Sequence, residues 1–323
     1  MPTSLNASDL PATSLPIIDL SGAESGDPRR LAEIAAEIGS ACRDKGFFYV
    51  VGHGIDPALQ AAMFEQSRQF FALPEADKLA LHKANSSANR GYEPLRGQVL
   101  EAGTPPDLKE GFYMGPELGA EHPAVQAGRF NHGPNQWPQA LPEFREVNLR
   151  YLEAVSDLAQ RLMGLMALSL GLPHTHFDDY CRDPLTTLRL LHYPPQPTNA
   201  APGEKGCGAH SDFGGLTLLL QDGSGGLQVW DQVNGEWLSG TPVPGAYVIN
   251  LGDMIARWTN DRYHSTLHRV INTSGGERYS IPFFYSGNPD HLVECLPGSD
   301  EPPRYPAVTV EEHLREMYRR TYA

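Results

Sequence analysis

Two His-x-Asp tripeptides are the parts of this chain whose residue types and spacing could bind a metal ion. They are His176-Phe177-Asp178 and His210-Ser211-Asp212. In an extended segment, residues i and i+2 project to the same side, so a His-x-Asp can present an imidazole nitrogen and a carboxylate oxygen to one ion. His176 follows a Gly-Leu-Pro helix stop, and polar residues there are typical of a solvated helix start. We therefore predict that His210 and Asp212 bind metal.

A third metal ligand is expected further along the chain. His268 begins a predicted strand, and His264 is a rival candidate four residues earlier, for which the alternative is a surface or supporting role. Two imidazoles and one carboxylate leave coordination positions open, which suits Fe(II) oxygen chemistry better than a closed structural site. His210, Asp212 and His268 are thus a candidate iron site.

A carboxylate-binding pair is predicted on a later strand. Arg278 and Ser280 are two residues apart, so strand alternation places the guanidinium and the hydroxyl on one face, where they can bind one carboxylate. The alternative is an exposed arginine at a strand edge. Arg189 and Tyr193 also share a face of an apolar strand, which predicts a lined pocket because a buried guanidinium needs a partner.

The elements that must position these residues change character along the chain. Apolar spacing predicts helices over residues 28–45, 57–71, 142–170 and 309–318. Residues 83–140 have little periodicity and are expected to be irregular. Short strands are predicted over residues 15–20, 47–51, 186–193, 216–221, 227–233, 236–238, 247–251, 268–272 and 279–285. Asn234-Gly235 predicts a type I′ hairpin turn. The pattern, with its 32 Gly and 28 Pro, favours a closed or double-sheet antiparallel β fold.

The composition and charge of the chain disfavour several classes of partner. The formal net charge of −14 disfavours nucleic acid and anionic membrane surfaces. No apolar run is long enough to span a membrane, and no secretory signal is recognisable, so we expect a cytoplasmic protein. The four scattered cysteines predict reduced thiols rather than disulfides or a zinc-thiolate site. The oligomeric state stays open.

Taken together, the motifs resemble the non-haem Fe(II), 2-oxoglutarate-dependent dioxygenases of the isopenicillin N synthase-like branch. The resemblance covers nearly the whole chain. Its motifs lie at residues 15–20, 42–54 and 70–74 in the N-terminal part, and at residues 210–212, 226–229, 250–253, 268–270 and 278–280 in the C-terminal part.

The resemblance implies a mainly β fold, with a double-stranded β-helix (jelly-roll) core and helices packed on its outer face. The Ser/Thr/Asn/Pro-rich start of the chain predicts a mobile arm over residues 1–15, and the resemblance implies an α/β region over residues 16–140. Residues 141–323, with the long helix, the catalytic core and the C-terminal helix, would form one compact unit with that region. It also implies His210, Asp212 and His268 as iron ligands, and Arg278 and Ser280 on the distal carboxylate of 2-oxoglutarate, with Tyr193 as a further donor.

The implied reaction uses O2 to oxidise a small molecule, by hydroxylation or desaturation, and converts 2-oxoglutarate to succinate and CO2. Ascorbate is a candidate reductant. Two alternatives stay open: an isopenicillin N synthase-like or ascorbate-using oxidase that does not consume 2-oxoglutarate, and a non-catalytic jelly-roll protein that binds metal or a small acid. Leu191 stands where the plant branch usually has Asn, so that contact is not expected here.

The substrate side is expected to contain aromatic residues. We predict that Tyr92, Phe112, Phe213 and Phe284 line it, together with the segment around Asn89. An amino-acid-like, aromatic or heterocyclic substrate would fit such a lining.

Overall fold

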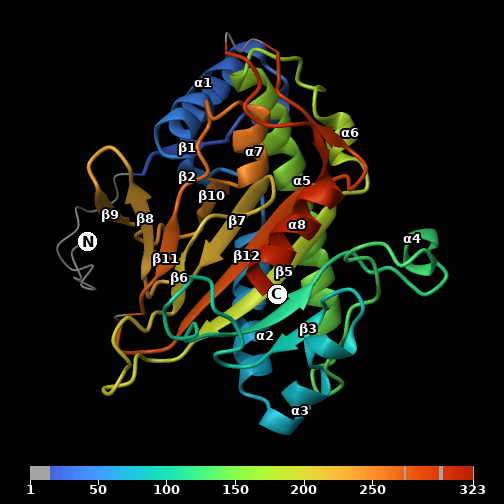
Figure 1. The fold of residues 1–323 in the computed structure, drawn as a ribbon, viewed down its shortest axis with the longest axis vertical. Coiled ribbons are helices and arrows are strands. Elements are labelled where there is room, and N and C mark those ends of the chain that lie inside the picture. Colours follow the sequence, from blue (N-terminus) through green and yellow to red (C-terminus); the bar gives the residue numbers. More distant parts are fainter. Residues whose placement is uncertain (1–14, 273, 298–300, 323) are drawn as a thin grey trace.

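Two predominantly antiparallel β-sheets of unequal size face each other in the computed structural model, which describes residues 15–272, 274–297 and 301–322 (Figure 1). The expected arm therefore lies outside the described residues except for Leu15, which is buried. The larger sheet has the strand order β1-β2-β10-β7-β12-β5-β4-β3, and the smaller has the order β6-β11-β8-β9. β1 pairs with β2 in parallel.

The strands of the larger sheet are β1 (Ile17–Asp19), β2 (Phe47–Val51), β3 (Gly91–Glu93), β4 (Glu110–Met114), β5 (Leu185–Tyr193), β7 (Leu216–Gln221), β10 (Tyr247–Leu251) and β12 (Arg278–Gly287). Those of the smaller sheet are β6 (Cys207–His210), β8 (Leu227–Asp231), β9 (Glu236–Ser239) and β11 (His268–Val270). A separate pair consists of β13 (Leu292–Val293) and β14 (Val308–Thr309).

The α-helices are α1 (Pro28–Asp44), α2 (Pro57–Phe71), α3 (Glu75–Ala80), α4 (Pro123–Gln126), α5 (Phe144–Ser169), α6 (Asp178–Cys181), α7 (Asp253–Trp258) and α8 (Val310–Tyr322), with short 3-10 turns at Ala23–Ser25 and Lys83–Asn85. The starts of α1 and α2 follow one rule. Asp27 and Asp56 accept hydrogen bonds from the first free backbone N–H groups, and each is followed by a proline whose missing N–H costs nothing there. Within the described chain, no helix has the length and apolar character needed to cross a membrane.

Strand alternation divides the larger sheet into two faces. On β7, Leu216, Leu218 and Leu220 join the main core under α1, α2 and α5, whereas Thr217 and Leu219 face the space between the sheets. β5 and β12 alternate in the same way. On these two strands, the residues that face the inner space are Thr187, Arg189, Leu191, Tyr193, Arg278, Ser280, Pro282, Phe284 and Ser286.

Two apolar clusters close the inner space. One joins Phe47 and Tyr49 of β2 to Leu227 and Val229 of β8, and the other includes Tyr193, Cys207 and Val270. Polar side chains between these clusters are therefore enclosed by both sheets.

Two local predictions were wrong. The Asn234-Gly235 hairpin forms, but only Gly235 has a positive φ, because the loop spans four residues and is closed by Asp231, whose carboxylate accepts hydrogen bonds from the backbone of Val233 and Asn234. The segment 83–140 is not wholly irregular, since it contains β3, β4 and α4. All five residues of β4 are buried, so its sequence lacks the polar and apolar alternation that reveals a strand.

Candidate active site

His210, Asp212 and His268 meet in the space between the two sheets. His210 is the last residue of β6 and His268 the first of β11, and the strand register places them directly opposite each other. Oδ1 of Asp212 lies 3.7 Å from Nε2 of His210 and 3.9 Å from Nε2 of His268. Across the part of the chain that the structure describes, this is the one group of three such side chains close enough to share an ion.

Both imidazoles are oriented by the backbone. Nδ1 of His210 lies 2.8 Å from the carbonyl oxygen of Gly208, and Nδ1 of His268 lies 3.2 Å from that of Thr266. A carbonyl oxygen can only accept a hydrogen bond, so each Nδ1 carries the ring proton. Each Nε2 is then unprotonated and has its lone pair available on the side of Asp212. Burial, together with repulsion from His210, lowers the pKa of His268 to about 4, which keeps that ring neutral at pH 7.

The carboxylate of Asp212 is held by its other oxygen. Oδ2 accepts hydrogen bonds from the Thr217 hydroxyl at 2.6 Å and from the Asn250 amide at 2.8 Å. Burial opposes the negative charge, but the two imidazoles and these two donors together hold the pKa of Asp212 below its usual value. Oδ1 is thus the ionised oxygen that remains for a ligand.

This donor set fits a divalent cation. Three acceptor atoms converge with no proton between them, and their separations are too long for hydrogen bonds, so a cation is the group that would satisfy all three. Two neutral imidazoles and one carboxylate with open positions are typical of Fe(II) oxygen chemistry. Bound there, Fe(II) would supply O2 binding and the redox step.

The other candidate ligands lie elsewhere. His176 and Asp178 are exposed, and Asp178 starts the short helix α6, as expected for a solvated helix start. The backbone N–H of His264 donates to the carbonyl of Cys42 at the end of α1, and its side chain is not part of the converging group. Of the two rival histidines, His268 is the one that lies in the converging group.

Arg278, Ser280 and Tyr193 line a cavity that also contains the two histidines and Asp212. Arg278 lies opposite Tyr193 in the pairing of β12 with β5, and its guanidinium carbon is 4.6 Å from the centre of the tyrosine ring. Nε of Arg278 donates to the carbonyl of Gly225 at 2.6 Å. Nη1 is buried without a hydrogen-bond partner among the described residues, which is costly unless an anion binds there. The cavity therefore fits a carboxylate.

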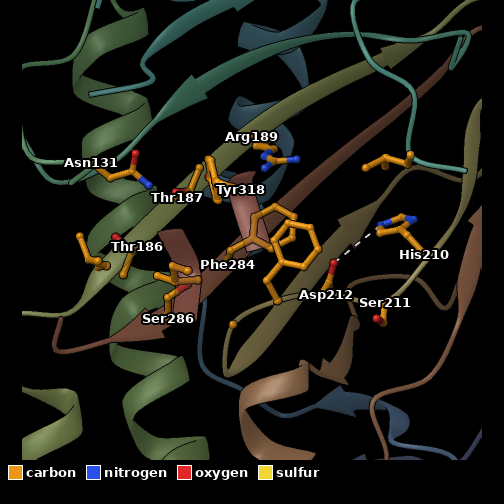
Figure 2. A pocket seen from close by; sticks show the side chains of 15 residues that line it. Asn131, Thr186, Thr187, Arg189, His210, Ser211, Asp212, Phe284, Ser286 and Tyr318 are labelled. Atoms are coloured by element: carbon orange, nitrogen blue, oxygen red, sulfur yellow. Dashed lines mark ion pairs between the residues drawn. The ribbon is translucent and has the colours of Figure 1, made fainter. Parts of the chain in front are cut away.

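A second cavity adjoins the metal-binding group on the other side (Figure 2). Phe213 and Phe284, which the sequence analysis placed on the substrate side, both line this cavity. The C-terminal helix α8 contributes Leu314 and Tyr318 to its wall, and His313 on the same helix binds the carbonyl of Phe213 at 2.9 Å.

Tyr92 and Phe112, which were also predicted to lie on the substrate side, are not brought to either cavity. Phe112 pairs with Leu190, whose side chain points to the helix-covered face of the sheet, so Phe112 points to that face as well. The centre of its ring lies 4.4 Å from the ring centre of Phe70. Tyr92 lies opposite Phe112 and donates a hydrogen bond to Glu110. The inward residue of β4 is instead Tyr113, which pairs with Arg189.

Several lining residues were not predicted from the sequence. The polar or titratable ones among them include Lys109, Asn131, Thr187, Cys207, Thr217, Asn250, Ser286 and Tyr318. Thr187 has the parity of Arg189 and Tyr193, a signal that could have identified it. Lys109 and Asn131 come from the segment whose strands the sequence did not reveal. The four cysteines are free, as predicted, and burial raises the pKa of the Cys207 thiol to about 12.

Comparisons with known proteins agree with this site. Residues 15–140 match the family model described as non-haem dioxygenase in morphine synthesis N-terminal, and residues 184–287 match that of the 2OG-Fe(II) oxygenase superfamily. The 2-oxoglutarate-Fe(II) type oxidoreductase hxnY of Emericella nidulans is 48% identical over 317 residues, which cover 96% of this chain and 91% of the relative.

Solved structures of the same kind match over the full length. The crystal structure of a full-length Neurospora crassa protein in complex with alpha-KG has a TM-score of 0.84 and 30% identity, with 100% of both chains covered. The structure of the same protein with alpha-KG and thymine has a TM-score of 0.83 and 30% identity, with 98% of this chain and 99% of that chain covered.

Fold and site together define a jelly-roll oxygenase of the non-haem iron type. The chain belongs to the 2OG-Fe(II) oxygenase superfamily, and it is a 2-oxoglutarate-dependent dioxygenase that uses Fe(II) as its metal. The predicted family, fold class and cofactors are confirmed.

Proposed function

We propose that this dioxygenase oxidises a small planar ring compound that carries a carboxylate or a carbonyl oxygen. The observation that carries this proposal is the position of Arg189 in the second cavity. Figure 2 shows Arg189 and Phe284 between the metal-binding side, with His210 and Asp212, and the side formed by Thr187.

Arg189 stands between two aromatic rings. Its guanidinium carbon lies 4.6 Å from the ring centre of Tyr113 and 4.5 Å from that of Phe284. Cation–π contacts with both rings restrict the guanidinium, and a guanidinium can contact a planar oxygen-bearing group at two points. Behind it, Glu93 accepts a hydrogen bond from Tyr113. Burial opposes the ionisation of Glu93, but Lys83, Tyr113 and Arg189, in that order, hold its pKa below the usual value.

The wall of the cavity beside Arg189 also contains a polar side chain, Asn131, which is held in place by hydrogen bonds. The side-chain oxygen of Asn131 accepts a hydrogen bond from the Asn89 side chain at 2.7 Å. The backbone carbonyl of Asn131 accepts one from the fully buried Arg90 at 3.1 Å. The segment around Asn89 thus supports the pocket from behind rather than lining it. Amide, hydroxyl and guanidinium groups next to an aromatic ring match a ring compound with polar substituents.

The chemical class has support from a solved structure. The Neurospora crassa protein, which is 30% identical over nearly the whole chain, binds thymine, a planar ring with carbonyl oxygens. Phe284 would stack on such a ring in this chain, and Arg189 would hold its oxygen atoms.

For the cofactors, the proposal assigns His210, Asp212 and His268 as the Fe(II) ligands. Arg278, with its buried Nη1, would pair with the distal carboxylate of 2-oxoglutarate, and Ser280 and Tyr193 would donate to the same group. The charges support these roles, because the positive charges of Fe(II) and Arg278 equal the negative charges of Asp212 and the 2-oxoglutarate dianion.

Succinate release from 2-oxoglutarate across a substrate panel tests the substrate class. The panel pairs pyrimidine and pyridine rings that carry carbonyl or carboxylate groups with the same rings lacking them, and with aliphatic acids. We expect succinate with the oxygen-bearing rings, and an increase of about tenfold or more in their KM for Arg189→Met, with a smaller increase for Arg189→Lys. Turnover of aliphatic acids alone would refute the proposed class.

A further inference from the structure

Lys109 is a buried lysine in the cavity that contains Arg278 and the metal-binding group. Its side chain is 4% exposed and lines this cavity together with Tyr193 and Arg278. Burying an ammonium group is costly, and a buried ion pair gains little stability over apolar packing. The presence of this lysine therefore calls for a reason other than stability.

The strand register places Lys109 in line with the carboxylate-binding residues. Glu110, the first residue of β4, pairs with His192 of β5, so Lys109, one step earlier, comes level with Tyr193. Tyr193 in turn pairs with Arg278 of β12. The ammonium of Lys109, next to β4, the phenol of Tyr193 on β5 and the guanidinium of Arg278 on β12 therefore lie in one row. All three line the cavity between the sheets.

Asp107 fixes the ammonium group without using all of its donors. One oxygen of Asp107 accepts from Lys109, and the other accepts from the backbone N–H of Gly208 at 2.9 Å, on the strand that carries His210. Within the described ranges, Asp107 is the one oxygen acceptor of Lys109, with the Cys207 sulfur as a further weak partner. An ammonium has three N–H donors, so at least one is left for a ligand.

The charge of this lysine is maintained although it is buried. Burial opposes protonation, but the surrounding Cys207, Asp107 and Tyr193 raise the pKa of Lys109 above its usual value. The pair with Asp107 adds no net charge to the cavity, so a second cation near Arg278 does not disturb the neutral balance with the dianion.

We propose that Lys109 is a second cationic contact for the distal carboxylate of 2-oxoglutarate, on the Tyr193 side of the cavity opposite Arg278. This inference rests on the proposed cosubstrate site. It adds a binding residue from the N-terminal part of the chain to a group otherwise built by β5 and β12. The segment around Asp107 would then contribute directly to cosubstrate affinity, beyond covering β6.

Calorimetric titration of the Mn(II)-loaded protein tests this role without turnover. The ligands are 2-oxoglutarate and 2-oxobutyrate, which lacks the distal carboxylate. The main variant is Lys109→Met combined with Asp107→Asn, because it removes both charges while an amide oxygen can still accept from Gly208. Asp107→Asn alone is the matched control, since it keeps the ammonium. Lys109→Gln combined with Asp107→Asn gives a second neutral variant should the Met variant fail to fold.

We expect the neutral variants to bind 2-oxoglutarate about 10- to 100-fold more weakly and 2-oxobutyrate within twofold of the parent, whereas the control stays within a few-fold for both. Unchanged 2-oxoglutarate affinity in a folded neutral variant would overturn the inference, as would equal losses for both ligands, which indicate a merely structural lysine. If the parent itself did not bind 2-oxoglutarate, the proposed cosubstrate site would fail instead.

Discussion

His210 and His268 face each other across the pairing of β6 with β11, with ring centres 4.3 Å apart and both Nε2 atoms directed at the same oxygen of Asp212. Both Nδ1–H groups donate to backbone carbonyls. The two Nε2 atoms and Oδ1 of Asp212 are therefore all hydrogen-bond acceptors. Such a cluster is unfavourable until a cation binds it. Metal binding should therefore be linked to the stability of the fold.

Metal addition is expected to stabilise the protein through Asp212. At a free Mn(II) concentration of about 100 times Kd, the free energy of unfolding should rise by about 2.7 kcal/mol, since the ion binds the folded state alone. In Asp212→Asn the rise should disappear, because the ionised ligand is lost. Thermal or denaturant unfolding with and without metal measures both values, and equal stabilisation of parent and variant would contradict the assignment.

The two donors to Asp212 are expected to control metal affinity. Thr217→Val removes the 2.6 Å hydrogen bond to Oδ2, so the carboxylate loses part of its orientation. We expect about a 10- to 100-fold weaker metal affinity, the usual effect of removing a residue that orients a ligand. Thr217→Ser keeps the hydroxyl and serves as the control. Competition with a metal-binding dye measures the affinities, and equal values for Val and Ser would mean that the hydroxyl does not orient Asp212.

Removing the guanidinium of Arg278 should weaken 2-oxoglutarate binding. In Arg278→Met the distal carboxylate would lose its charged partner in a largely dry cavity, at a cost of about 2–3 kcal/mol. The KM for 2-oxoglutarate should rise accordingly, with a smaller rise for Arg278→Lys. A KM that does not change in Arg278→Met would locate the carboxylate site elsewhere.

The stability of the metal-free protein should fall in mildly acidic solution, with a contribution from His53. This ring is 6% exposed, Nε2 donates to the carbonyl of Gly245, and Nδ1 accepts from the N–H of Ile55. Burial lowers the pKa of His53 below the 6.5 of a free imidazole. The unfolded state therefore binds the proton first, so this contribution is complete above pH 6.5 and is lost as the pH falls below it.

Urea unfolding between about pH 5 and 7.5 tests this sign. The parent should lose up to about 1.4 kcal/mol per pH unit more than His53→Gln, which cannot titrate. Identical slopes for parent and variant would show that His53 does not contribute.

The three side chains that converge between the sheets could be picked out from the sequence because the information is local. His210 and Asp212 are two residues apart, and His268 begins a strand, so alternation and the family motifs were enough. The substrate side depends on which face of β4 turns inward, and β4 was not recognised as a strand. Phe112 was therefore chosen where Tyr113 has the inward parity.

Other residues of the site depend on contacts between distant segments. Asn131 reaches the cavity because buried Arg90 holds its backbone, and Lys109 is held by Asp107, which is anchored to Gly208. No periodicity in the sequence reports these pairings. The opposite error occurred at Asn234-Gly235, where a strong dipeptide signal was overridden by the carboxylate of Asp231.

The most direct test of the account is succinate formation from 2-oxoglutarate by the purified protein, measured with and without added Fe(II) and with an oxygen-bearing ring compound as substrate. We expect succinate in a one-to-one ratio with the O2 consumed, dependent on Fe(II) and absent in Asp212→Asn. Substrate oxidation at an unchanged rate without 2-oxoglutarate, or succinate formation that survives in Asp212→Asn, would contradict it.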